Sequence, residues 1–248
     1  MKNFFLSVGD HLEMSKVIVY GNGKSRSKYH DVNMVYDDVI TWGCNAIYRD
    51  VKVDHLVSVD YGMQHEIYTS GYAKENSCWF LDWNIIPPEF SGLDTIKNQH
   101  DIVYENEPTE HGYVLNGKRG DDLYVTWVDG SNSVSDISYP REWCSGATAV
   151  YLACQQGATE LFLLGFDLSI NNIYEGSKNY PKQVEHPEWK QQLLTIFKEF
   201  PFIEFYWVEP QHPLVGGDTL EKLTYITYDT FKHTLTQGDN YVNRTRST

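Results

Sequence analysis

Short apolar runs alternate with polar and glycine-rich stretches along the whole chain. Six of these runs are bounded by turn residues, which is typical of buried β-strands. They cover residues 16–20, 39–42, 55–59, 123–128, 160–164 and 202–208. The sequence therefore predicts a sheet whose strands are covered on both faces.

Helical patterns follow some of these runs. Small and apolar side chains fill residues 145–154, with Ser145 suited to the N-cap and Gly157 suited to the left-handed position after the last turn. A second helix is predicted from about Pro187 to Phe200, where apolar residues recur at helical spacing. Alternating strands and helices predict an α/β fold with a three-layer, mostly parallel, Rossmann-like sheet.

The chain length fits one domain. With 248 residues, of which 41% are hydrophobic, the chain can bury a substantial core. We expect a single Rossmann-like domain over residues 1–248. Residues 84–120 are rich in proline and acidic side chains and are predicted to form an insertion. Residues 170–185 are polar and aromatic and are predicted to form a lid loop over a site.

Charge and cysteine content narrow the class of protein. A net charge of −14 disfavours binding to nucleic acids and to anionic membrane surfaces, which attract basic proteins. The four cysteines form no C-x-x-C pair, and three adjoin apolar or aromatic residues, which indicates reduced, buried thiols. No apolar run has membrane-spanning length. These features predict a cytoplasmic protein without a transmembrane segment, and they leave the oligomeric state open, a homo-oligomer being one option.

The stretch Val17–Arg26, "VIVYGNGKSR", resembles a phosphate-binding loop at first sight. A P-loop requires a glycine five residues before its Gly-Lys pair, and that position holds Ile18. The dinucleotide pattern G-x-G-x-x-G also fails, because Arg26 stands where its third glycine belongs. What remains is a buried strand followed by a sharp turn, where α/β proteins bind ligands.

Polar residues stand directly after four of the predicted strands. They are Asn22, Asn45, Asp60 and Asp167. In a parallel sheet these strand ends meet at one edge, so we expect the four side chains to surround one crevice. The two aspartates form no tandem metal motif, and no cluster has zinc-ligand spacing. We therefore predict no metal site; Asp60 is expected to accept a ribose hydroxyl and Asp167 to cap a turn.

Four segments resemble the bacterial sialyltransferases of glycosyltransferase family 42, and a wider group of Rossmann-like proteins that open with Gly-Asn-Gly-Pro-Ser. The segments are "VIVYGNGKS", "TWGCNAIY", "CSGATAVYLACQQGATELFLLGFDLS" and "HPEWKQQLLTIFKEFPFIEFYWVEP". The similarity runs over residues 16–210 and is poor over residues 62–138. Enzymes of that family have a single Rossmann-like domain. They transfer sialic acid from a cytidine monophosphate donor to a sugar hydroxyl with inversion, and the donor is a substrate rather than a cofactor.

The resemblance, together with the strand-end residues, implies a nucleotide-binding set. Its members are Gly21, Asn22, Gly23, Ser25, Asn45, Asp60, Ser145 and Gly146. This chain also departs from the family at three positions. Lys24 replaces the proline of the opening motif, Asp60 replaces an asparagine, and Ser169 stands where a lid tyrosine belongs.

The resemblance also implies a catalytic set. His186 matches the family's general base, Arg141 lies one position from an arginine of the family, and Tyr174 falls near a lid tyrosine that holds the donor phosphate. Histidine is a common general base near neutral pH, and such a base contributes about 10²–10⁴ in rate. Arg141 and Tyr174 have the donors needed to neutralise a departing phosphate. As plain structural residues, the three would be a surface histidine, a surface ion-pair partner and a loop anchor.

The sequence thus predicts a nucleotide-sugar-dependent glycosyltransferase, with a CMP-linked sugar as donor, a carbohydrate as acceptor and no required cofactor. Two alternatives stay open. One is a magnesium-dependent nucleotide phosphotransferase or pyrophosphokinase on the same scaffold, with Asp60 or Asp167 as metal ligand. The other is a non-catalytic member of the fold, such as a viral or surface-assembly component, because a fold does not guarantee activity.

Overall fold

The structure is a computed structural model of the 248-residue chain. It describes residues 15–29, 36, 38–82, 108–109, 112–114, 125–129, 143–169, 172–180, 186–212 and 222–236. Most of the predicted insertion at 84–120 therefore lies outside the described residues, as does Arg141.

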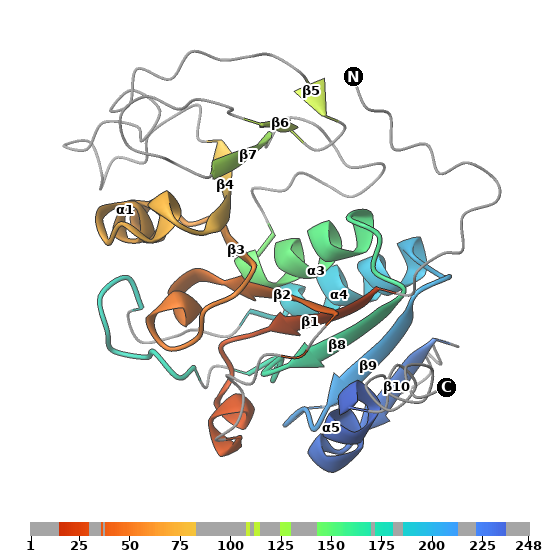
Figure 1. Ribbon diagram of the computed structural model, residues 1–248. Coiled ribbons are helices and arrows are strands. Elements are labelled where there is room, and N and C mark those ends of the chain that lie inside the picture. Colours follow the sequence, from red (N-terminus) through yellow and green to blue (C-terminus); the bar gives the residue numbers. More distant parts are fainter. Residues whose placement is uncertain are drawn as a thin grey trace, which may run out of the picture.

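In the described part of the chain, ten strands form one sheet, shown in Figure 1. The strands are β1 (Lys16–Tyr20), β2 (Val39–Cys44), β3 (His55–Ser58), β4 (Ser77–Asp82), β5 (Pro108–Thr109), β6 (Gly112–Val114), β7 (Val125–Asp129), β8 (Glu160–Leu164), β9 (Glu204–Val208) and β10 (Leu223–Ile226). Their order is β10-β9-β8-β1-β2-β3-β4-β7-β6-β5. All neighbours from β10 to β7 pair in parallel, and only β7-β6 and β6-β5 are antiparallel. The prediction of a mostly parallel sheet is confirmed.

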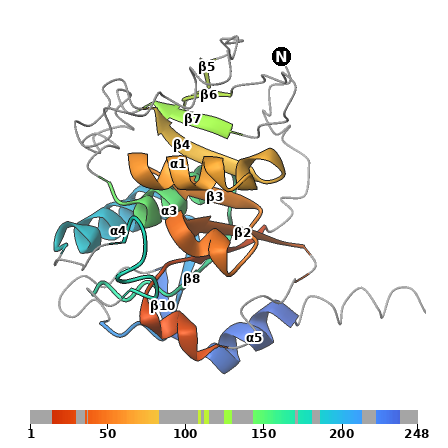
Figure 2. The ribbon, with the colours of Figure 1, turned by 90° about the vertical axis from the view of Figure 1, so that its left-hand side faces the viewer.

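Helices cover both faces of the sheet and make the predicted three layers. The α-helices are α1 (Tyr61–Thr69), α3 (Ser145–Gln155), α4 (Glu188–Glu199) and α5 (Tyr228–Thr236). The short 3₁₀ helices are η1 (Lys24–Lys28), η2 (Asn45–Arg49) and η3 (Tyr72–Lys74). Helices α3 and α4 lie side by side on one face, whereas α1 and α5 pack on the opposite face (Figures 1 and 2).

Side-chain alternation along the strands feeds two separate cores. In β1, Val17 and Val19 join the core under α3 and α4, whereas Ile18 and Tyr20 join the core shared with α1 and α5. All four are at most 2% exposed. Because successive side chains of a strand point to opposite faces, a strand buried on both sides must be apolar throughout. This is why the central strands appear in the sequence as unbroken apolar runs.

The strand order reverses beside β1. The chain builds the sheet outward from β1 through β2, β3, β4 and β7, and then returns to place β8 on the other side of β1. From β8 it continues outward to β9 and β10. In open α/β sheets, a crevice forms at such a reversal, outside the carboxyl ends of the strands. The ends of β1 and β8, at Tyr20 and Leu164, thus mark where a ligand site is expected.

The sequence predicted the C-terminal end of α3 correctly but placed its N-cap one residue too late. Cys144, and not Ser145, is the N-cap, and its sulfur accepts a hydrogen bond from the backbone N–H of Ala147. At the other end, Gly157 has a φ of +94° and its N–H bonds to the carbonyl of Cys154. The N–H of Ala158 reaches back to the carbonyl of Ala153, which completes a Schellman motif.

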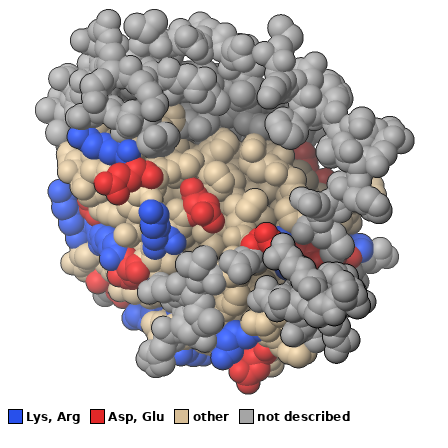
Figure 3. All heavy atoms as spheres, in the orientation of Figure 1, with Lys and Arg blue, Asp and Glu red and all other residues tan. Residues whose placement is uncertain are grey.

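On the face shown in Figure 3, acidic and basic side chains alternate along one edge and do not form a patch of one sign. All four cysteines are free, three of them are buried, and Cys144 is half-buried. Within the described part of the chain, no helix combines the length and the apolar character needed to cross a membrane.

Candidate functional site

A cavity of about 400 Å³ lies at the strand ends where the strand order reverses. This size is within the range of small-molecule sites. Eight of the residues expected to act in binding or catalysis line it: Gly21, Asn22, Gly23, Asn45, Asp60, Ser145, Gly146 and His186. Asp167 lines it as well, so the four polar strand-end residues do surround one crevice.

The floor of the cavity is made where the loops after β1 and β8 touch. The N–H of Gly21 donates to the carbonyl of Leu164 at 2.8 Å, and the N–H of Gly23 donates to that of Gly165 at 2.9 Å. A Cβ atom on Gly21 would lie 2.4 Å from the carbonyl oxygen of Gly165. Only glycine permits this approach, so the Gly-Asn-Gly sequence joins two strand ends. Its amides at Gly21 and Gly23 are committed to the protein and not to a phosphate.

Asn22 is a buried polar residue between these loops, with 8% exposure. Its side-chain amide donates to the carbonyl of Cys44 and to the hydroxyl of Tyr180, each at 3.0 Å. These two acceptors fix the orientation of the amide. The Oδ1 atom of Asn22 has no hydrogen-bond partner among the described residues. A buried acceptor without a partner carries a desolvation cost.

Asp60 projects from the end of β3 and is held by two neighbouring elements. Its Oδ2 accepts from the side-chain amide of Asn45 at 2.8 Å and from the hydroxyl of Ser145 at 3.3 Å. The Ser145 hydroxyl in turn accepts from the N–H of Val59 at 3.0 Å. Asn45 has a φ of +51°, a left-handed conformation that asparagine tolerates better than most residues. The carboxylate thus has a fixed position while remaining exposed to the cavity.

Asp167 and Ser25 interact beneath the cavity. Asp167 Oδ2 accepts from the backbone N–H of Ser25 at 2.8 Å, so this aspartate caps the turn that starts η1, as expected. Ser25 itself is fully buried and does not line the cavity. Its expected contact with a nucleotide does not fit this arrangement, because the aspartate lies between the serine backbone and the open space.

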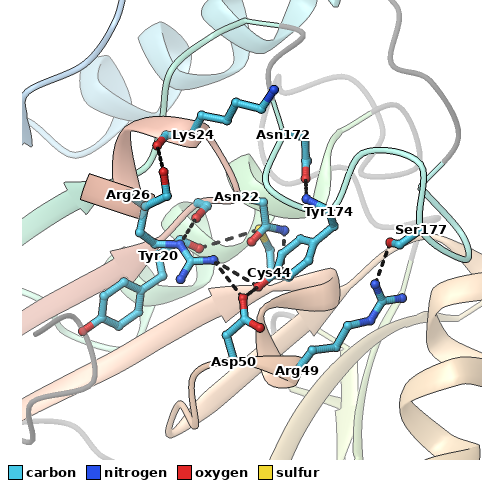
Figure 4. Close-up of polar contacts among 12 residues, drawn as sticks. Tyr20, Asn22, Lys24, Arg26, Cys44, Arg49, Asp50, Asn172, Tyr174 and Ser177 are labelled. Atoms are coloured by element: carbon cyan, nitrogen blue, oxygen red, sulfur yellow. Dashed lines mark hydrogen bonds and ion pairs between the residues drawn. The ribbon is translucent and has the colours of Figure 1, made fainter. Parts of the chain in front are cut away.

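Tyr174 also occupies a different place from the one expected. Figure 4 shows its hydroxyl meeting Arg26 and Asp50: it accepts from Arg26 Nη2 at 3.0 Å and donates to Asp50 Oδ2 at 2.7 Å. Burial, together with the hydrogen bond to Asp50, raises its pKa and keeps it neutral. Tyr174 is 7% exposed and does not line the cavity. It anchors the loop that carries it, and a phosphate contact does not fit this geometry.

The described part of the predicted lid, residues 172–180, is attached to the domain at several points. Arg49 donates to the hydroxyl of Ser177 at 2.7 Å and to the carbonyl of Lys178 at 2.9 Å, and its Nε donates to Glu66 at 2.8 Å. The other oxygen of Glu66 accepts from Asn179 at 2.7 Å. These contacts place the cavity-lining residues of the segment, which are Asn172, Asn179 and Tyr180.

His186 lies on the cavity wall immediately before α4. Its Nδ1 atom lies 2.8 Å from Glu188 Oε1. Its ring stacks on Trp189 with a centroid separation of 4.5 Å and an angle of 12° between the planes. The side chain is 33% exposed. The ring is therefore ordered by two neighbours on the same helix turn and remains accessible from solvent.

The described wall of the cavity is acidic. It contains Asp60, Asp167 and Glu188, and no lysine or arginine stands among the residues that the structure describes there. Lys24 points elsewhere, with Nζ 3.8 Å from Glu175. Arg141 lies outside the described residues, two positions before Trp143, which lines the cavity.

Sequence reasoning missed several residues of the wall. Cys44, Cys144 and Tyr180 line the cavity, and burial raises the pKa of each side chain, to about 12 for Cys144. The thiols and the phenol are therefore neutral polar groups at pH 7. Their positions in the sequence gave a signal, because Cys44 adjoins Asn45 and Cys144 adjoins Ser145.

Comparisons with known proteins add nothing to this geometry: no family model, curated protein or solved structure matches the chain. In the part of the chain that the structure describes, no three His, Cys, Asp or Glu side chains come together in a group able to hold a metal ion. We therefore infer the function from the arrangement of the cavity residues.

Proposed function

We propose that the protein is a nucleotide-sugar-dependent glycosyltransferase that uses His186 as its general base. In the proposed reaction a sugar hydroxyl attacks the anomeric carbon of the donor. The hydroxyl proton passes to Nε2 of His186, the new glycosidic C–O bond forms, and the bond from the anomeric carbon to the phosphate oxygen breaks. The electron pair of that bond leaves with the nucleotide, and attack from the opposite side inverts the anomeric centre. A CMP-linked sugar is the proposed donor, and the cytoplasm is the proposed compartment.

The observation that carries this proposal is the position of His186. It lines the same cavity as Asn22, Asn45 and Asp60, which come from the ends of β1, β2 and β3. A general base, hydroxyl-binding acceptors and an open space thus meet at the place where α/β sheets bind ligands.

The polar groups near Asp60 suit the sugar or ribose part of a donor. A fixed carboxylate beside an asparagine and a serine accepts hydrogen bonds from hydroxyl groups. Asn22 and Asn45 line the same edge of the cavity, and their buried Oδ1 atoms have no hydrogen-bond partner among the described residues. An anionic carboxylate repels phosphate, so we assign this part of the wall to the neutral, hydroxyl-bearing portion of the substrate.

The phosphate requires positive charge from other groups. Helix α3, eleven residues long, begins at the cavity, and its N-terminus supplies roughly half a positive charge. Arg141, a short distance upstream in the sequence, is the proposed second source. Tyr174 is not proposed to bind the phosphate, because its hydroxyl is hydrogen-bonded to Arg26 and Asp50.

Isothermal titration calorimetry of the purified protein tests the proposal, with cytidine, uridine, adenosine and guanosine nucleotides and their sugar conjugates as ligands. We expect one class to bind, and we expect Asp60→Asn and Asn22→Ala to weaken that binding. Absence of binding by every nucleotide and nucleotide sugar would refute the proposal. Triphosphate binding that requires magnesium would favour the phosphotransferase alternative.

A turnover assay with the donor that binds then tests the base. His186→Ala is expected to lower the rate about 10²–10⁴-fold with little effect on donor affinity. The matched control is His212→Ala, because His212 is exposed and does not line the cavity. Equal rates for the wild type and His186→Ala would remove the base assignment.

A further inference from the structure

We infer that Glu188 is a positioning residue for His186: its carboxylate holds the Nδ1–H form of the imidazole, so that the Nε2 lone pair is free to take a proton. This inference rests on the proposed function and adds a residue to it. Three observations support it: the contact at Nδ1, the position of the carboxylate at a helix N-terminus and the orientation of the ring.

The contact at Nδ1 determines the tautomer. Glu188 Oε1 lies 2.8 Å from His186 Nδ1, a normal distance for a hydrogen bond between a charged and a neutral group. A carboxylate only accepts hydrogen bonds, so Nδ1 must carry the proton. A neutral imidazole has one N–H, and the other nitrogen, Nε2, then has its lone pair available.

The carboxylate lies at the N-terminus of a helix. Glu188 is the first residue of α4, where the helix N-terminus favours negative charge. Hydrogen bonds from its own backbone N–H and from His186 lower the pKa of this carboxyl, so it is ionised at neutral pH. An ionised Glu188 also stabilises the imidazolium that forms when His186 accepts a proton.

The ring is oriented by Trp189. The two rings stack at 4.5 Å with a 12° angle between their planes, which limits rotation of the imidazole. His186, Glu188 and Trp189 all line the cavity. A surface ion pair alone would not require the histidine to stand on the wall of the cavity that holds Asn22 and Asp60.

No other ionisable group of the described wall replaces Glu188. The remaining ones are Asp60, Asp167, Cys44, Cys144 and Tyr180. Burial raises the pKa of both thiols and of the phenol, so they are neutral at pH 7. The carboxylate Oδ2 atoms of Asp60 and Asp167 are hydrogen-bonded to Asn45 and Ser145, and to Ser25, respectively.

The first test is ¹⁵N NMR of the histidine side chains in the full chain, which needs no substrate. His186 is assigned by its loss in His186→Ala. We expect the neutral imidazole of the wild type to show a protonated Nδ1 and an unprotonated Nε2. Glu188→Ala is expected to shift the population toward the Nε2–H form, and Glu188→Gln to give an intermediate result, because its amide oxygen accepts the same bond without the charge.

The control is Glu199→Gln, at the other end of α4, about 16 Å along the helix axis. It is expected to leave the His186 signals unchanged. A wild-type protein with the proton on Nε2, or a Glu188→Ala variant with unchanged signals, would overturn the inference. These outcomes do not depend on whether any nucleotide binds, so failure of the inference and failure of the proposed function are distinguishable.

The second test uses the donor found by calorimetry. Glu188→Ala is expected to lower kcat about 10- to 100-fold while KM changes little, the range found when a partner that orients a metal-bound histidine is removed. In a His186→Ala background the same substitution is expected to have no further effect. An equal loss in both backgrounds would show that Glu188 does not act through His186, and would overturn the inference.

Discussion

Replacing Gly21 by alanine should separate the loops that form the floor of the cavity. The added Cβ would lie 2.4 Å from the carbonyl oxygen of Gly165, and 2.9 Å from its carbonyl carbon. Both atoms belong to the backbone, so no side-chain rotation relieves the contact. Gly21 does not have a left-handed φ, so the effect isolates the steric contact from backbone strain.

The magnitude follows from two contributions. Overpacking a tight site costs about 1–3 kcal/mol. Moving the loops apart also weakens the hydrogen bonds from Gly21 to Leu164 and from Gly23 to Gly165, each worth about 1 kcal/mol. We therefore expect Gly21→Ala to lower the free energy of unfolding by about 2–4 kcal/mol. Urea unfolding followed by tryptophan fluorescence measures this change.

Gly146→Ala is the matched control. Its Cβ would lie 3.4 Å from the side chain of Phe166 and 3.9 Å from the sulfur atoms of Cys44 and Cys144, which are ordinary contacts, and the residue lies inside α3. Alanine stabilises a helix relative to glycine by up to about 1 kcal/mol, so this variant should be as stable as the wild type or slightly more stable. Surface changes usually alter the free energy of unfolding by no more than about 0.5 kcal/mol. If Gly21→Ala differs from the wild type by no more than this, the loops after β1 and β8 do not touch as described.

Three more predictions concern the segment 172–180 and its anchors. Tyr174→Phe removes the hydroxyl that joins Arg26 to Asp50 and should cost about 2–3 kcal/mol in urea unfolding, because both lost bonds involve charged groups; no loss would refute the network. Arg49→Ala should speed hydrogen exchange in residues 172–180 while exchange in α3 stays unchanged, and equal exchange in this segment would contradict its attachment through Arg49. Burial favours a higher pKa for Glu66, but its hydrogen bonds, led by the one from Arg49, hold the pKa of this carboxyl below its ordinary value. The ionised Glu66 therefore stabilises the fold above the unfolded pKa of about 4.3, and this stabilisation is lost as the pH falls through the folded pKa. The stability advantage of the wild type over Glu66→Gln should therefore shrink between pH 7 and pH 3, and a constant difference would contradict this coupling.

The sequence predicted the central sheet well because those strands are buried on both faces. β1 and β8 begin and end at the predicted residues, because every side chain after their first residues, Lys16 and Glu160, is apolar and buried. The polar residues after β1, β2, β3 and β8 were predicted to meet for the same reason, because parallel strands end at one edge.

Elements with mixed polarity were not predicted. β4, with the sequence "SCWFLD", and α1, with "YGMQHEIYT", lack a clean apolar period, and β10 exposes two of its four residues. Tertiary contacts stabilise these elements more than local pattern does. The role of Tyr174 could not be predicted for a similar reason, because its hydrogen-bond partners Arg26 and Asp50 are far from it in the sequence.

We propose that a nucleotide sugar binds at the strand ends where the sheet order reverses. Backbone amide NMR with the donor identified by calorimetry tests it most directly. We expect the largest chemical-shift changes at the cavity residues that follow β1, β2 and β3 and at the start of α3, including Asn22, Asn45, Asp60 and Ser145. Changes confined to other parts of the chain, or no change at these residues with saturating donor, would contradict binding at this site.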